Sequence, residues 1–242
     1  MVMIRNERIL AAMLVVCGGV FAEDAYIQGT GQQAILTDCC PGADLRVEVD
    51  YAFDEVENSM RTIGLETSST GNAFHFLVAG TDLYFGIGNT WTGYRPNITA
   101  DTARHTAILD AKGGALSFVT DGATVWTTGI TNATTRTGTW PLAVFGANKA
   151  AASLVTYQPS GNYAKMKLYS LKVYENNAIA HYYKPWRSVD GAFTGLKDPC
   201  TGRCFVNCAN ARTQFLSGGE ISDAPAWDLA ETHNEDVSYQ IV

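Results

Sequence analysis

Residues 45–53 read Leu45-Arg46-Val47-Glu48-Val49-Asp50-Tyr51-Ala52-Phe53, so that apolar side chains recur at every second position. Successive side chains of a β-strand point to opposite faces, which places the apolar set on one face and the charged set on the other. This alternation predicts a strand that packs one face against a core and leaves the other face in water.

Outward from this strand, short runs of the same kind are separated by clusters of Gly, Asn, Asp and Thr. Residues 116–120 and 124–127 flank Asp121-Gly122, a pair that supplies the positive φ angles of a tight hairpin. In residues 165–175 the apolar positions switch face, which indicates either a bulge or a central strand covered on both sides. Asn176-Asn177 then predicts a turn into a further strand.

Composition agrees with an all-β fold and limits the partners. No long window repeats apolar positions at helical spacing, and the 242 residues are 46% hydrophobic and 17% charged, as in ordinary globular proteins. The sequence therefore predicts an all-β fold, specifically a two-sheet antiparallel β-sandwich. The formal net charge of −7 argues against nucleic acid as a partner, because binding it requires clustered Lys and Arg.

The first residues have the pattern of a secretory signal peptide. Arg5 and Arg8 precede an apolar run, residues 9–16, and small residues follow up to Ala22. The run is shorter than the roughly 20 residues that cross a bilayer, so no membrane span is expected after cleavage. A lipoprotein anchored through Cys17 is the alternative, although the residue before it is larger than such motifs prefer. We expect a secreted, periplasmic or cell-surface protein.

The chain divides into three parts on this basis. Residues 1–22 are the signal peptide, and residues 23–219 form one β-sandwich domain. Residues 220–242 are rich in Asp and Glu and contain no Lys or Arg, which predicts an acidic C-terminal extension that is solvated or loosely docked.

Five cysteines follow the signal peptide, namely Cys39, Cys40, Cys200, Cys204 and Cys208. Disulfides persist outside the cytoplasm, so all five are disulfide candidates, and their odd number leaves one thiol over. The spacing of the last three differs from that of zinc modules and iron–sulfur sites. No metal site is assigned to them.

Several segments resemble, in order, the bacterial and phage concanavalin A-like domains, also called laminin G-like or LamG-like jelly rolls. They comprise an opening pair of strands, a central strand followed by an aromatic, Pro-containing strand, and a closing hairpin. In this chain they are residues 25–35 with 45–50, residues 141–146 with 167–175 and 182–187, and residues 190–198 with 215–219.

The resemblance implies a jelly roll whose first and last strands lie side by side, in a bacterial, lectin-like protein. With those strands adjacent, we expect at least one bridge from Cys39-Cys40 to the 200–208 segment. Calcium binding by laminin G domains makes Asp101 and Asp121 conceivable oxygen donors, but the ligands are not assignable and no EF-hand loop is present. No cofactor is predicted.

A pair of carboxylates on the 45–53 strand raises the question of catalysis. Glu48 and Asp50 share a face, and glycosidases use two such acids. The hydrolases of this fold carry a third acid, and here its positions hold Ala52 and Phe53. The four histidines, His75, His105, His181 and His233, match no nucleophile motif and are interpreted as strand or loop residues. We therefore predict that the protein is not an enzyme.

The candidate carbohydrate-binding residues lie in the loop at 88–95. Trp91 and Tyr94 offer rings for stacking on sugars, while Asn89 and Arg95 offer hydrogen bonds to hydroxyls. Alternatively, Trp91 covers the core. We predict a non-catalytic recognition module that binds a glycan or surface protein. A structural or adhesive envelope protein that mediates protein–protein assembly and a divergent glycoside hydrolase remain alternatives. The oligomeric state is not indicated.

Overall fold

The computed structural model describes residues 24–42, 44–65, 74–87, 98–111, 115–129, 141–148, 159–160, 162–209, 213–219 and 221–224. All regular elements in this part of the chain are strands. They are β1 (Tyr26–Thr30), β2 (Ile35–Leu36), β3 (Arg46–Phe53), β4 (Met60–Leu65), β5 (Phe74–Ala79), β6 (Asp82–Ile87), β7 (Arg104–Asp110), β8 (Ala115–Thr120), β9 (Ala123–Gly129), β10 (Ala143–Val144), β11 (Ala147–Asn148), β12 (Pro159–Ser160), β13 (Asn162–Tyr163), β14 (Lys165–Glu175), β15 (Ala178–Ser188), β16 (Thr194–Lys197), β17 (Cys204–Phe205), β18 (Leu216–Gly218) and β19 (Ser222–Ala224).

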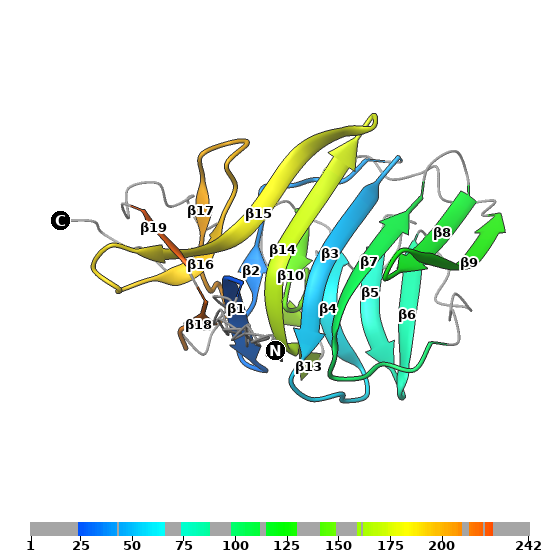
Figure 1. Ribbon diagram of the computed structural model, residues 1–242, viewed down its shortest axis with the longest axis horizontal. Helices are drawn as coiled ribbons and strands as arrows, with labels where there is room; N and C mark the ends of the chain where they lie inside the picture. The colour runs from blue at the N-terminus through cyan, green and yellow to red at the C-terminus, as the bar shows by residue number, and fades with distance from the viewer. Residues whose placement is uncertain are drawn as a thin grey trace, which may run out of the picture.

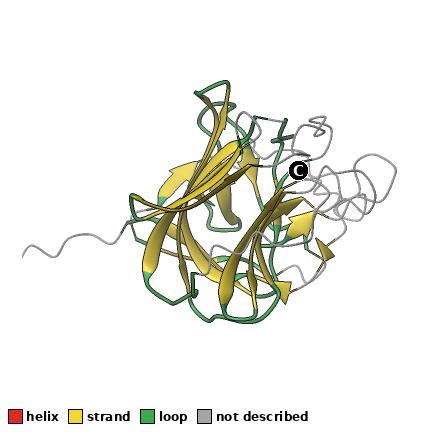
Figure 2. Ribbon diagram, turned by 90° about the vertical axis from the view of Figure 1, so that its right-hand side faces the viewer, coloured by secondary structure: helices red, strands yellow, loops and turns green. Residues whose placement is uncertain are grey.

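The strands form two sheets. The larger runs β17-β16-β15-β14-β3-β7-β8-β9, with β1 beside β14 and β19 beside β15. The smaller contains β2, β4, β5, β6 and β10–β13. Figure 1 shows β14, β3 and β7 side by side across the front, and Figure 2 shows the two layers of strands. The predicted two-sheet β-sandwich of jelly-roll type is confirmed, and most pairings are antiparallel.

The core lies between the two sheets, and the 45–53 segment supplies much of it. Val47, Val49 and Tyr51 of β3 are each at most 1% exposed, as their alternation predicts. Phe76 of β5 packs edge-on against Tyr51, with ring centroids 5.4 Å apart, and lies 6.1 Å from the ring of Phe118 on β8. Phe76 therefore joins the smaller sheet to two strands of the larger one.

The predicted turns and irregularities are present. The β8–β9 hairpin turns at Asp121 and Gly122, whose φ angles are 47° and 78°. The register of β14 against β3 shifts between Leu168 and Ser170, so the change of face at this point is a bulge. Asn176 and Asn177, both at positive φ, turn β14 into β15.

The ends of the fold meet as expected, but the closing hairpin does not form. β1 pairs with β18 through Tyr26 and Gly218, which places the first and last strands of the predicted domain side by side. β16 instead pairs with β15 and β17. Gly195 permits this close pairing, because a Cβ there would lie 1.9 Å from the carbonyl oxygen of Phe205.

Of the two terminal segments predicted from the sequence, only part of the C-terminal one is described. Ser222–Ala224, at the beginning of the predicted acidic extension, form β19 and pair in parallel with β15. The predicted signal peptide lies outside the described residues. In the part that is described, no segment forms a helix with the length and hydrophobicity needed to cross a bilayer.

Candidate functional site

The outward face of the larger sheet carries four half-buried tyrosines, which we call the tyrosine face. They come from β1, β14 and β15, and a cationic side chain lies over each ring. The pairs are Tyr26 with Lys167 at 4.3 Å, Tyr169 with Arg104 at 3.8 Å, Tyr174 with Arg46 at 4.9 Å, and Tyr182 with Lys184 at 4.4 Å. At partly exposed sites each such cation–π contact contributes roughly 0.5–1 kcal/mol.

One end of this face is hollowed into a cleft of about 170 Å³, which we call the Arg46 cleft. Arg46 of β3 pairs across the sheet with Tyr174 on one side and Asp110 on the other, so three strands form its floor. Its full lining is Asp44, Arg46, Asp110, Tyr174, Asn176 and Asn177. The Nε atom of Arg46 is buried and has no hydrogen-bond partner among the described residues.

The two carboxylates considered for catalysis lie on the same outward face, and both are ion-paired. Glu48 accepts hydrogen bonds from Lys172 at 2.7 Å and from the Tyr174 hydroxyl at 3.1 Å. Burial alone would raise the pKa of Glu48, but these hydrogen bonds lower it below its ordinary value. Asp50 accepts two hydrogen bonds from the Arg104 guanidinium, at 2.8 and 2.7 Å. Glu48 therefore lacks the raised pKa of a general acid, and both oxygens of Asp50 are occupied by Arg104.

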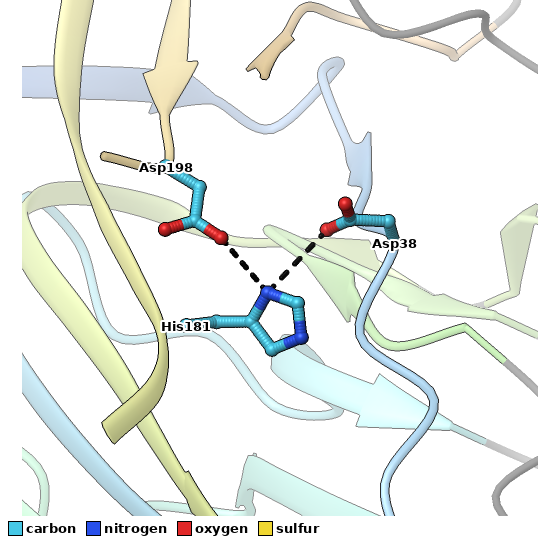
Figure 3. Close-up of side chains that lie close together, drawn as sticks. All are labelled: Asp38, His181 and Asp198. Carbon is cyan, nitrogen blue, oxygen red and sulfur yellow. Dashed lines mark hydrogen bonds and ion pairs between the residues drawn. The ribbon is translucent and has the colours of Figure 1, made fainter. Parts of the chain in front are cut away.

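A second polar cluster lies at the open end of the β15–β16 hairpin, just beyond the pair formed by Lys184 and Lys197. His181 of β15 points its Nδ1 atom toward two carboxylates, Asp198 at 2.8 Å and Asp38 at 3.6 Å (Figure 3). The side chain of Asp198 is fully buried, while those of His181 and Asp38 are 16% and 17% exposed. One ligand atom from each of the three lies within 4.8 Å of the others.

Hydrogen bonds fix the two carboxylates of this cluster. Asp198 follows β16 and accepts the backbone N–H groups of Tyr182 and Cys200, at 3.0 and 2.9 Å. Burial would raise the pKa of Asp198, but these bonds and that from His181 lower it. Asp38 accepts the Tyr183 hydroxyl at 3.0 Å and Arg203 at 3.1 Å. The imidazole of His181 stacks on the Tyr183 ring, with 4° between their planes.

The expected proximity of the 38–40 segment to the 198–208 segment is present, as the Asp38–Arg203 pair shows. The predicted disulfide bridge between these segments is absent, since no disulfide joins the five described cysteines. Three of the thiols lie in different hydrophobic clusters: Cys39 packs in the main core, Cys204 against Trp186, and Cys208 against small side chains near Ala34. These three thiols therefore belong to separate parts of the interior.

The two remaining thiols lie beside the carboxylates of the His181 cluster. Desolvation and the negative charge of Asp38 raise the pKa of Cys40. Desolvation and the charge of Asp198, with which its thiol hydrogen bonds, raise the pKa of Cys200. Both thiols are therefore held in the protonated form at neutral pH, which disfavours a nucleophilic role.

Asp101 and Asp121, named as conceivable calcium donors, lie on either side of a histidine. Asp121 contacts Nδ1 of His105 at 2.7 Å, and Asp101 contacts Nε2 at 2.8 Å. Burial opposes a charge on His105, but the two carboxylates outweigh it and raise its pKa above 6.5. Both nitrogens face an acceptor, so the imidazolium form satisfies the site best.

The first prediction is a pH dependence that originates at His105. Its pKa is higher in the folded protein than in the unfolded chain, so protonation favours folding. We expect its stabilising contribution to be complete below about pH 6.5, the unfolded value, and to be lost as pH rises through the folded pKa. NMR titration of the imidazole measures its pKa in the folded protein. Denaturant unfolding at several pH values measures the change in stability. An imidazole that titrates below 6.5, or the same pH profile in His105→Gln, would contradict this assignment.

The predicted carbohydrate-binding residues Trp91, Tyr94, Asn89 and Arg95 lie outside the described residues. Trp186 of β15 is fully buried. The sequence predicted His181 as a strand or loop residue, and the structure places it in β15. Its contact with two carboxylates was not predicted. Asp38 and Asp198 come from loops elsewhere in the chain, and no local motif connects them to β15. The only sequence signal was the proximity expected between the first and last parts of the fold.

Comparisons with known proteins supply no family. No protein-family model matches the chain, and no curated protein does so either. Domains LG4-5 of the mouse laminin α1 chain are similar at 16% identity and a TM-score of 0.44, over 66% of this chain. The chain spans 44% of that laminin structure.

Two carbohydrate-binding structures are also similar. One is the CBM40 domain of the Ruminococcus gnavus IT-sialidase bound to α2,3-sialyllactose, at 14% identity and a TM-score of 0.41, over 63% of this chain and 92% of that one. The other is domain 4 of AbnA, a GH43 extracellular arabinanase from Geobacillus stearothermophilus, in complex with arabinotriose. It has 12% identity and a TM-score of 0.42, over 64% and 76% of the two chains. The similarity extends no further than the β-sandwich fold.

Proposed function

We propose that this protein is a non-catalytic recognition module, secreted or held at the cell surface, that binds a glycan in the Arg46 cleft. The observation that carries the proposal is the chemistry gathered there: one aromatic ring, one guanidinium, two carboxylates and two amides. Sugars present apolar C–H faces that stack on aromatic rings, and hydroxyl groups that exchange hydrogen bonds with such polar groups.

The Arg46 side chain gives the cleft a further reason to bind an oxygen-rich ligand. Its Nε–H group is buried and has no partner among the described residues. A buried donor without an acceptor costs about 1–3 kcal/mol. Arg46 lines the cleft, and the positive charge of its guanidinium favours oxygen-bearing ligands over apolar ones.

The ion pairs of Glu48 and Asp50 support binding without catalysis. A glycosidase needs one carboxyl group that stays protonated near neutral pH and a second that is ionised and accessible to the sugar. Glu48 is held ionised by Lys172 and Tyr174, and both oxygens of Asp50 are engaged by Arg104. Hydrolysis of β-glucans or galactans that disappears in a Glu48→Gln/Asp50→Asn double variant would replace this proposal with a divergent glycosidase.

A glycan array probed with the protein lacking residues 1–22 tests the proposal. We expect binding to a restricted set of glycans, and the same glycans should raise the melting temperature with their concentration, because they bind the native state alone. An array on which no glycan binds would favour the assembly function instead.

The second prediction is that Tyr174→Ala weakens binding of the selected glycan roughly tenfold, or about 1.4 kcal/mol, through loss of the stacking ring. Tyr182→Ala is the matched control, because Tyr182 belongs to the tyrosine face but does not line the cleft. Isothermal titration calorimetry measures both affinities. Equal losses in the two variants would place the sugar elsewhere on this face and contradict the assignment to the cleft.

A further inference from the structure

Two histidines of this protein each contact two aspartates, but the geometries differ. The carboxylates beside His105 contact different ring nitrogens, so the imidazole lies between them. Both carboxylates beside His181 face the same atom, Nδ1, at 2.8 and 3.6 Å (Figure 3). One N–H group makes a good hydrogen bond to only one of them. Three ligand atoms thus converge on one point at His181 and not at His105.

The spacing around His181 is close to that of ligands sharing one metal ion. Atoms bound tetrahedrally at about 2.0–2.2 Å from an ion lie roughly 3.3–3.6 Å apart. The distance from Nδ1 to Asp38 Oδ1 is 3.6 Å, within this range. The 2.8 Å distance from Nδ1 to Asp198 Oδ2 is that of a hydrogen bond, and it would lengthen by well under 1 Å if an ion replaced the proton.

We propose that His181, Asp38 and Asp198 form a binding site for a divalent transition-metal ion of the Zn²⁺ class. An imidazole nitrogen with two carboxylate oxygens is a donor set that Zn²⁺ accepts, whereas Ca²⁺ prefers oxygen atoms alone. Two carboxylates also supply negative charge for a divalent cation, and the charge of Asp38 is shared with Arg203. This site lies on the inner side of β15 and is independent of the Arg46 cleft.

The groups around the three ligands orient them as a second layer does in metal sites. The Tyr183 hydroxyl donates to Asp38, and the N–H groups of Tyr182 and Cys200 donate to Asp198. Arg203 engages Oδ2 of Asp38, while Oδ1 accepts the Tyr183 hydroxyl and faces His181. Such partners hold ligand side chains in place before the ion binds. A water molecule would complete the coordination.

The third prediction concerns Zn²⁺ binding by the full mature protein after treatment with a chelator. Calorimetric titration with ZnSO₄, and metal analysis after dialysis, should give one equivalent of Zn²⁺. Asp38→Asn and His181→Gln should each weaken binding at least tenfold, because each removes a ligand. His105→Gln is the matched control and should bind Zn²⁺ like the wild type, since its carboxylates do not converge.

Substitution of Co²⁺ in the wild type gives a readout that depends on no variant. Bound Co²⁺ should show the visible absorption of a four-coordinate site. Absence of Zn²⁺ binding to the wild type would overturn the proposal, as would equal affinities in the His181→Gln and His105→Gln proteins. Glycan binding before and after the chelator separates this test from that of the Arg46 cleft, because the two sites share no residue.

Discussion

Phe76→Ala is expected to lower the free energy of unfolding by about 3–5 kcal/mol, the range found when a buried Phe is cut back to Ala. Phe76 is fully buried, and its ring meets Tyr51 and Phe118, which belong to the opposite sheet. The substitution therefore leaves a cavity at the contact between the two layers. Urea unfolding followed by tryptophan fluorescence measures the loss.

Phe76→Leu is the control for this experiment, since it keeps an apolar side chain of similar volume. Hydrophobic exchanges that nearly conserve volume usually cost less than about 1.5 kcal/mol. A loss below about 1 kcal/mol for the alanine variant would contradict the packing of the two sheets around this ring.

Asp198→Ala is the second change with a large expected effect, again about 3–5 kcal/mol of stability. The carboxylate is fully buried and accepts hydrogen bonds from His181, from the Thr201 hydroxyl, and from the N–H groups of Tyr182 and Cys200. Removing it leaves these donors unpaired in a region that water reaches poorly, and each unpaired buried donor is costly. Thermal and urea unfolding without added metal measure the loss.

Asp190→Ala is the matched control, because Asp190 also accepts hydrogen bonds within a turn, from Ser188 and Ala192, but is exposed. Water can replace the lost acceptor there, so a much smaller loss of stability is expected. Similar losses in the two variants would mean that burial of Asp198 does not determine its contribution.

The fold was largely predictable because its main signals are local. The alternation of Val47, Val49 and Tyr51 reflects the period of a strand, and the structure buries all three. Asp121-Gly122 specifies a turn through its own backbone preferences. The pairing of β16 with β17 was not predictable in this way, since it depends on the approach of Phe205 to Gly195 across a loop.

The candidate sites depend on contacts that no local pattern contains. Alternation places Arg46 on the outward face, but its pairing with Tyr174 depends on the register of β14 after the bulge. The His181 cluster is further from prediction, because its carboxylates come from one loop after β2 and another after β16. Residue types alone gave His181 no role beyond that of a strand residue. Only the packed sandwich brings these three side chains together.

Chemical-shift mapping with the glycan selected on the array tests the proposed binding site most directly. The proposal predicts that, in the isotope-labelled protein, the amide signals of Arg46, Asp110, Tyr174, Asn176 and Asn177 shift on saturation with the sugar, while those around His181 do not. Shifts confined to the 88–95 segment, with none in the cleft, would contradict binding in the Arg46 cleft. They would favour the loop that contains Trp91 and Tyr94 as the binding site.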